Sequence, residues 1–193
     1  SALPKIIFLH DPLSAEEHND LGVAYEKSGQ LDLAFKEYNK ALKKDKYFDR
    51  ARVNLGNVHF KKGEYDKAGQ EYLKAIQYDP NNPDSLNNLA WVYIIQRKKL
   101  NEAASLAERA LELDRSNGYL YLDTLGMIAF YQENCQEALN KIKKSIELTP
   151  RTETFRLEEE YEHLILIYRA LGLHEEVDRA TDELKFLKIN RGN

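Results

Sequence analysis

The residues best suited to chemistry in this sequence are its five histidines and its many carboxylates. His163 stands among four glutamates, and histidine beside carboxylates resembles the ligand set of a metal site. None of the five histidines (10, 18, 59, 163 and 174) has another three or four residues away, the spacing that would pair two ligands on one helix. Acidic residues also favour the positive dipole end at the start of a helix. We therefore predict a helix start here, without a bound metal, at Glu158, Glu159, Glu160 and Glu162.

Nucleophilic catalysis has as little support. Cys135 is the only cysteine, which excludes an intrachain disulfide and a multi-cysteine metal site. The sequence has no glycine-rich phosphate loop, no HExxH and no Gly-x-Ser-x-Gly. We predict a non-enzymatic protein without a cofactor; catalysis would require that this chain be one domain of a larger enzyme.

Composition narrows the class of partner. The chain has 193 residues, of which 42% are hydrophobic and 31% charged, and its formal net charge of −4 is no electrostatic footprint for nucleic acid. No stretch approaches the roughly 18 apolar residues of a membrane span. We therefore expect a protein or peptide partner, with no nucleic acid and no direct membrane span.

A repeat of 34 residues organises the chain. Its clearest copy lies between residues 50 and 80, with Leu55-Gly56, Gly63, Ala68, Tyr72 and Ala75 as landmarks. Self-similarity at a fixed period of this size indicates stacked supersecondary units. The same residue types return 34 positions earlier and, in part, later, at Leu21-Gly22, Gly29, Ala34, Tyr38, Ala41, Leu89-Ala90 and Tyr93.

The repeat predicts an all-α solenoid of about five stacked helical hairpins, the last one degenerate and capping. Ser14 with Glu17 forms a capping box for the first helix, and Asn82 with Pro83 restarts the chain at the third hairpin. A longer connection, 151–156, precedes the last hairpin. We expect an extended arm over 1–13, a disordered tail over 190–193, and repeats at about 14–47, 48–81, 82–116, 117–150 and 155–189.

Glycines inside the predicted helices require a packing reason, because glycine there costs roughly 1 kcal/mol relative to alanine. Gly22, Gly56 and Gly126 are expected where the two helices of one hairpin approach most closely. We expect alanines of the second helix to face these glycines, and the bulky residues Tyr38, Tyr72 and Ile142 to fill the gap beside the next repeat.

The order Leu-Gly, Tyr, Gly, Ala, Tyr, Ala, Pro across 34 residues resembles the tetratricopeptide repeat of bacterial-type proteins. The resemblance covers about residues 14–187 and is strongest in repeats one, two and four. The sequence departs from the family pattern at His59, Ala129, Ala107, Lys46 and Arg115. The resemblance implies a right-handed superhelix whose first helices line a concave groove for peptides or partner helices.

The resemblance also implies which residues line that groove. In this family an Asn just before the Leu-Gly pair forms a ladder to the backbone of an extended peptide, and an amide can both donate and accept hydrogen bonds. Further around the helix, Trp91, Met127 and Tyr131 make the carboxyl half more apolar, and rigid aromatics are typical anchors. The predicted groove residues are Asp20, Val23, Lys27, Asn54, Asn57, Lys61, Asn88, Trp91, Ile95, Thr124, Met127 and Tyr131.

The sequence bears on two other functions. Asp84 and Asn88 occupy the positions where the chaperone-tail clamp of some family members has a basic pair, so we reject that function. Self-assembly into a homodimer is the alternative, through the 6–9 arm or through the apolar residues of the last helix, Leu184, Phe186, Leu187 and Ile189.

The sequence begins at Ser1 rather than Met, so we expect the native start to be missing. The phrases at 86–91 and 122–126 resemble those of bacterial envelope-associated repeat proteins. We therefore favour a periplasmic or membrane-tethered protein over a cytoplasmic one.

Overall fold

The computed structural model describes residues 11–190, and within this range all regular secondary structure is α-helical. Of the predicted arm over 1–13, residues 1–10 lie outside the described residues, and so does the predicted tail except for Asn190, which ends the last helix. The ten helices are α1 (Ala15–Lys27), α2 (Leu31–Lys44), α3 (Asp49–Lys61), α4 (Tyr65–Tyr78), α5 (Pro83–Ile95), α6 (Leu100–Leu113), α7 (Gly118–Tyr131), α8 (Cys135–Leu148), α9 (Thr154–Ala170) and α10 (His174–Asn190).

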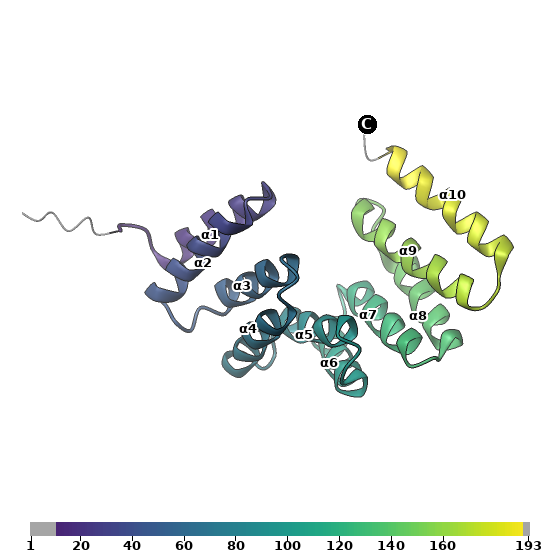
Figure 1. Ribbon diagram of the computed structural model, residues 1–193, viewed down its shortest axis with the longest axis horizontal. Helices are drawn as coiled ribbons and strands as arrows, with labels where there is room; N and C mark the ends of the chain where they lie inside the picture. Colours follow the sequence, from purple (N-terminus) through teal and green to yellow (C-terminus); the bar gives the residue numbers. More distant parts are fainter. Residues whose placement is uncertain (1–10, 191–193) are drawn as a thin grey trace, which may run out of the picture.

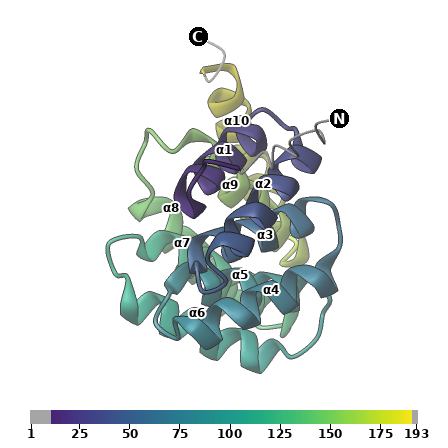
Figure 2. The ribbon, with the colours of Figure 1, turned by 90° about the vertical axis from the view of Figure 1, so that its left-hand side faces the viewer.

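The helices pack as five sequential hairpins that follow one another along an arch (Figure 1). Odd-numbered helices contact one another along the inner side, whereas α4 and α6 lie on the outer side. Viewed from the side of the first hairpin, both terminal hairpins lie above α4 and α6 (Figure 2). The all-α stack of hairpins predicted from the repeat is therefore confirmed.

Local sequence signals explain where two of the helices begin. Ser14 accepts from the Glu17 N–H while the Ser14 N–H donates to the Glu17 carboxylate, and Asn82 accepts from the Ser85 N–H ahead of Pro83. Both predicted caps are confirmed. The expected long connection before the last hairpin is shorter than predicted, because α9 already begins at Thr154 and Leu157 is fully buried on it.

The packing of the helical glycines corrects one expectation. A Cβ added to Gly56 would lie 2.5 Å from Tyr72 Cε1, and one added to Gly22 would lie 2.5 Å from Tyr38 Cε1. Each tyrosine therefore fills the space above the glycine of its own hairpin, rather than only the gap beside the next repeat. Ile142 does the same above Gly126. The physical reason is that a helix can approach a ring only where it carries no side chain.

Two glycines of the second hairpin should respond in opposite ways to substitution by alanine. Gly63 has a φ of +75°, so alanine there should cost about 1–2 kcal/mol of unfolding free energy. Gly69 lies inside α4 and a Cβ would meet only ordinary contacts, 3.4 Å from Val92, so alanine should stabilise by about 0.5–1 kcal/mol. Urea unfolding followed by circular dichroism measures both, and a stabilised Gly63→Ala would contradict the assigned turn.

Candidate functional site

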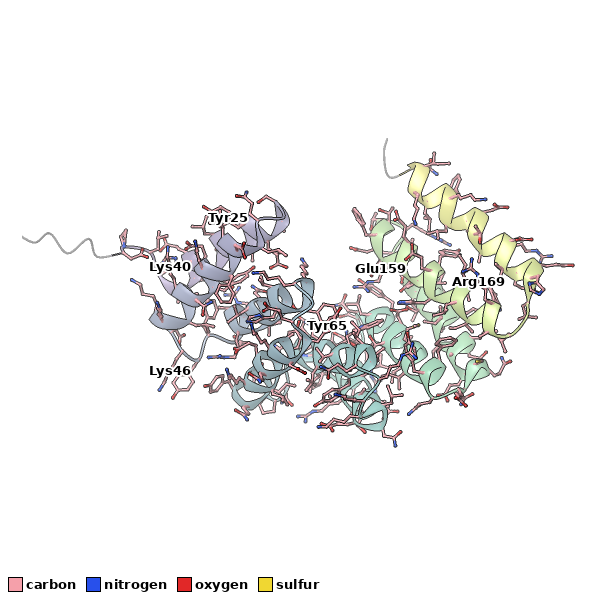
Figure 3. The ribbon with its side chains drawn as sticks, in the orientation of Figure 1. Tyr25, Lys40, Lys46, Tyr65, Glu159 and Arg169 are labelled. Carbon is pink, nitrogen blue, oxygen red and sulfur yellow. The ribbon has the colours of Figure 1, made fainter. Side chains whose placement is uncertain are left out.

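The inner helices enclose a hollow of about 570 Å³ that reaches from the first hairpin to the last. Its apolar surface comes from Phe60, Trp91 and Ile95, and a charged side at α9 includes Glu159, which Figure 3 labels at the opening. A volume of this size is typical of ligand sites. We name it the groove cavity; its lining residues are Glu26, Asn57, Phe60, Lys61, Tyr72, Asn88, Trp91, Ile95, Arg156, Glu159, Glu162 and His163.

A stack of two rings forms part of the cavity wall and joins α5 to α9. The ring centroids of Trp91 and His163 lie 5.6 Å apart with an interplanar angle of 27°. His163 Nδ1 in turn lies 2.7 Å from Oδ1 of Asp123 on α7, and Asp123 is completely buried. The stack and the ion pair thus tie three successive inner helices together at the cavity.

The electrostatics of His163 follow from this pairing. Burial disfavours a positive imidazole, but the hydrogen bond to Asp123 and the charge of Asp123 outweigh it, so the pKa of His163 lies above its ordinary value. The second oxygen of Asp123 has no hydrogen-bond partner among the described residues. His163 is therefore the side chain that compensates the Asp123 charge by direct contact.

A second buried carboxyl, Glu160, lies on the other side of α9. Its Oε1 is 2.6 Å from Ser145 Oγ and 2.7 Å from Thr149 Oγ1. Burial raises the pKa of Glu160 despite these hydroxyl contacts, and the nearby charge of Asp123 adds to the effect. The Ser145 and Thr149 hydroxyls can donate to the Glu160 carboxyl, and the backbone carbonyls of Tyr119 and Ser145 lie within hydrogen-bond distance of the same two hydroxyls.

The two asparagines predicted to form a ladder, Asn54 and Asn88, each bind an asparagine of the preceding repeat. Asn54 donates from Nδ2 to Asn19 Oδ1 at 2.9 Å, and Asn88 donates to Asn57 Oδ1 at 3.1 Å. Asn57 Oδ1 also accepts from the Tyr72 hydroxyl at 2.7 Å. These bonds join successive repeats, so the amides have a structural role in addition to any contact with a ligand. We therefore expect their removal to lower the stability of the fold.

The charged residues around the cavity are paired. Lys61 lies 2.7 Å from Glu26, Arg156 lies 2.9 Å from Glu159, and Lys188 of α10 lies 3.0 Å from Glu162. The rim therefore presents balanced charge around an apolar centre. Such a site favours an apolar side chain more than a strongly charged one.

The predicted groove residues divide into three groups in the structure. Five line the groove cavity: Asn57, Lys61, Asn88, Trp91 and Ile95.

The second group lies along the inner helices outside the cavity lining. Asn54 is half-buried, and Tyr131 is half-buried with the Arg97 guanidinium 5.1 Å from its ring centroid. Val23 packs against the core of the first hairpin, and α1 also exposes Asp20 and Lys27.

The third group is buried. Thr124 is fully buried and donates from Oγ1 to the Leu120 carbonyl, and Met127 is only 3% exposed. Both belong to α7, which is packed on nearly all sides, and we omit them from the binding surface proposed below.

Sequence reasoning missed the contribution of the last hairpin. In repeat five the residue just before the Leu is His163, which therefore occupies the groove position of Asn54 and Asn88. Phe60 could also have been predicted as a groove residue, since it lies one helical turn beyond Asn57. The helix start predicted at Glu158–Glu162 is wrong, because α9 begins at Thr154 and its first turn has no acidic residue. No group of three or more His, Cys, Asp or Glu in the described part of the chain is placed to hold a metal ion.

Comparison with known proteins gives the class. A TPR repeat profile matches residues 22–63 and 56–94, and a tetratricopeptide repeat profile matches residues 84–113. Together with the ten helices in five hairpins, these matches define the chain as an all-α TPR repeat protein. No curated protein matches the sequence.

Solved structures resemble the fold at low sequence identity. The Cut9–Hcn1 hetero-tetramer of the APC/C superposes with a TM-score of 0.83 at 21% identity; the match covers 94% of this chain but only 35% of that one. TTC0263, a thermophilic TPR protein of Thermus thermophilus, gives 0.76 at 16% identity, covering 91% and 96%. YrrB, described as a TPR protein with an unusual peptide-binding site, gives 0.61 at 21% identity, covering 90% and 86%.

None of the helices in the described range is both long and apolar enough to cross a membrane. TPR repeat proteins generally mediate protein–protein interactions and are usually non-enzymatic.

Proposed function

We propose that this protein is an adaptor that binds an extended segment of a partner protein in the groove cavity. The observation that carries the proposal is the cavity itself, which opens between the inner helices and has Trp91 and Ile95 on its surface. An apolar side chain of the segment enters between these residues, and the segment's backbone lies along Asn57 and Asn88.

The energetics place most of the affinity in the apolar contact. A backbone hydrogen bond to an amide contributes only about 0.5–1.5 kcal/mol. A fully buried aliphatic or aromatic side chain contributes about 1.5–3 kcal/mol. Because the rim charges are paired, the partner needs no net charge opposite to the rim.

The proposal is tested by selecting peptides from a displayed random library on the immobilised protein. We expect the selected peptides to share an aromatic or aliphatic residue. Ile95→Asp, which puts a charge into the cavity, should then weaken binding by about tenfold or more, equivalent to about 1.4 kcal/mol, measured by fluorescence anisotropy.

The matched control is Leu73→Asp on α4. Leu73 is 43% exposed and Ile95 is 39% exposed, but Leu73 is not among the cavity residues. Binding should therefore be unchanged in this variant. If both variants bind the peptides equally well, the groove cavity is not the binding site.

A second candidate function is self-assembly through the last helix. Phe186 is 64% exposed and Ile189 is 69% exposed, one turn apart on α10. A homodimer would cover both side chains. Light scattering tests this, and a monomer at high protein concentration contradicts it.

A further inference from the structure

The stack of Trp91 on His163 links parts of the chain that lie two repeats apart. Trp91 belongs to α5 and His163 to α9, and Asp123 of α7 lies between them in the fold and binds His163. Trp91 is half-buried and lines the groove cavity, whereas Asp123 has no exposed surface. The position of the indole at the cavity therefore depends on a residue that no ligand reaches.

Asp123 is the charged group in direct contact with His163, because the neighbouring charged residues are paired with other groups. On its own helix, Glu159 is paired with Arg156, and Glu162 is paired with Lys188 of α10. Glu160, with its raised pKa, faces the hydroxyls of α8. From α5 the contacting residue is Trp91, which does not titrate.

Protonation changes both contacts of the imidazole at once. A protonated His163 forms a charged pair with Asp123, and a cation attracts the face of an indole more strongly than a neutral ring does. Since the pKa of His163 is raised, this form persists above the ordinary histidine range. The stability that His163 contributes to the folded state is fully present below its pKa in the unfolded chain. It is lost as pH rises through the pKa of His163 in the folded protein.

We propose that Asp123 and His163 are positioning residues that hold Trp91 at the groove cavity through a stack that forms with protonated His163 and loosens with neutral His163. Protonation thus holds the wall formed by α9 against α5. The consequence for ligands rests on the function proposed above: the groove binds its peptide more tightly in the protonated state.

The stack can be followed without any ligand, because Trp91 is the only tryptophan of the chain. A protonated imidazole quenches indole emission more strongly than a neutral one. We expect Trp91 emission to rise in a single titration with a midpoint above the ordinary histidine value of about 6.5. Access of acrylamide to the indole should rise over the same pH range.

Three variants make the titration specific. His163→Gln should abolish it, and Asp123→Asn should move the midpoint to or below about 6.5, because burial then loses the main interaction that opposes it. His174→Gln is the matched control, since His174 is exposed on α10, and it should titrate like the natural protein. Circular dichroism establishes that each variant is folded, and the proton resonances of His163 give the same midpoint independently of the indole.

A flat emission profile in the natural protein, or an unchanged midpoint in Asp123→Asn, overturns the proposal. A His163 that only packs against Trp91 would still give the emission titration, but the access of acrylamide to the indole would not change over the same pH range. The comparison therefore separates positioning from simple packing.

The functional consequence is measured with the library-selected peptides. Their dissociation constant should rise about fivefold or more between about pH 6 and about pH 9 in the natural protein, and not in His163→Gln. If the indole titrates but no peptide binds the cavity, the adaptor proposal fails and the positioning stands. If peptides bind but the indole does not titrate, the positioning fails and the adaptor proposal stands.

Discussion

Replacement of Tyr72 by alanine should lower the free energy of unfolding by about 3–5 kcal/mol, the range for large aromatic truncations in a core. Tyr72 is 1% exposed, and its ring occupies the space left by Gly56 on the facing helix. Its hydroxyl donates to Asn57, which also accepts from Asn88, so the variant weakens a hydrogen-bonded link between repeats two and three as well.

Urea unfolding followed by circular dichroism measures this effect. The matched control is Tyr47→Ala, since Tyr47 is 59% exposed and contacts Tyr78 at the surface. It should cost less than about 1 kcal/mol, as surface substitutions do. Equal losses in the two variants would show that the ring above Gly56 is not a core element.

His163→Leu should have the second large effect, a loss of about 3–5 kcal/mol, because it leaves the buried Asp123 carboxylate without a compensating charge. Because the His163 side chain is 21% exposed, water lies close to the pair, and we expect a loss towards the lower end of that range.

A double variant provides the control. Asp123→Asn combined with His163→Gln replaces the charged pair by two amides that can hydrogen-bond, and it should recover most of the stability. Thermal and urea unfolding of the singles and the double give the coupling between the two positions. A fully stable His163→Leu single variant would mean that Asp123 finds another partner.

Much of the fold could be predicted because the repeat encodes it locally. The Ser14 and Asn82 caps and the glycines of left-handed backbone, such as Gly63, are set by neighbours in the sequence. The packing partner of Tyr72 was harder to predict, since the sequence shows which residue is bulky but not which neighbour it covers. That depends on the distance between the helices.

The candidate site could be predicted only in part. Trp91 and Asn88 follow from the register of the first helices within a repeat. The pairing of His163 with Asp123, 40 residues apart, depends on how strongly the stack curves, and the repeat period does not encode that curvature. The bond of Asn54 to Asn19 was missed for the same reason, because it joins two repeats across their interface.

The central claim is that a partner segment binds in the groove cavity, and the indole N–H resonance of Trp91 tests it most directly. On addition of a library-selected peptide to the isotope-labelled protein, we predict that this resonance and the side-chain amides of Asn57 and Asn88 shift together and saturate at one affinity. Shifts confined to the outer surface around Tyr47 and Leu73, with an unmoved Trp91 signal, would contradict the account.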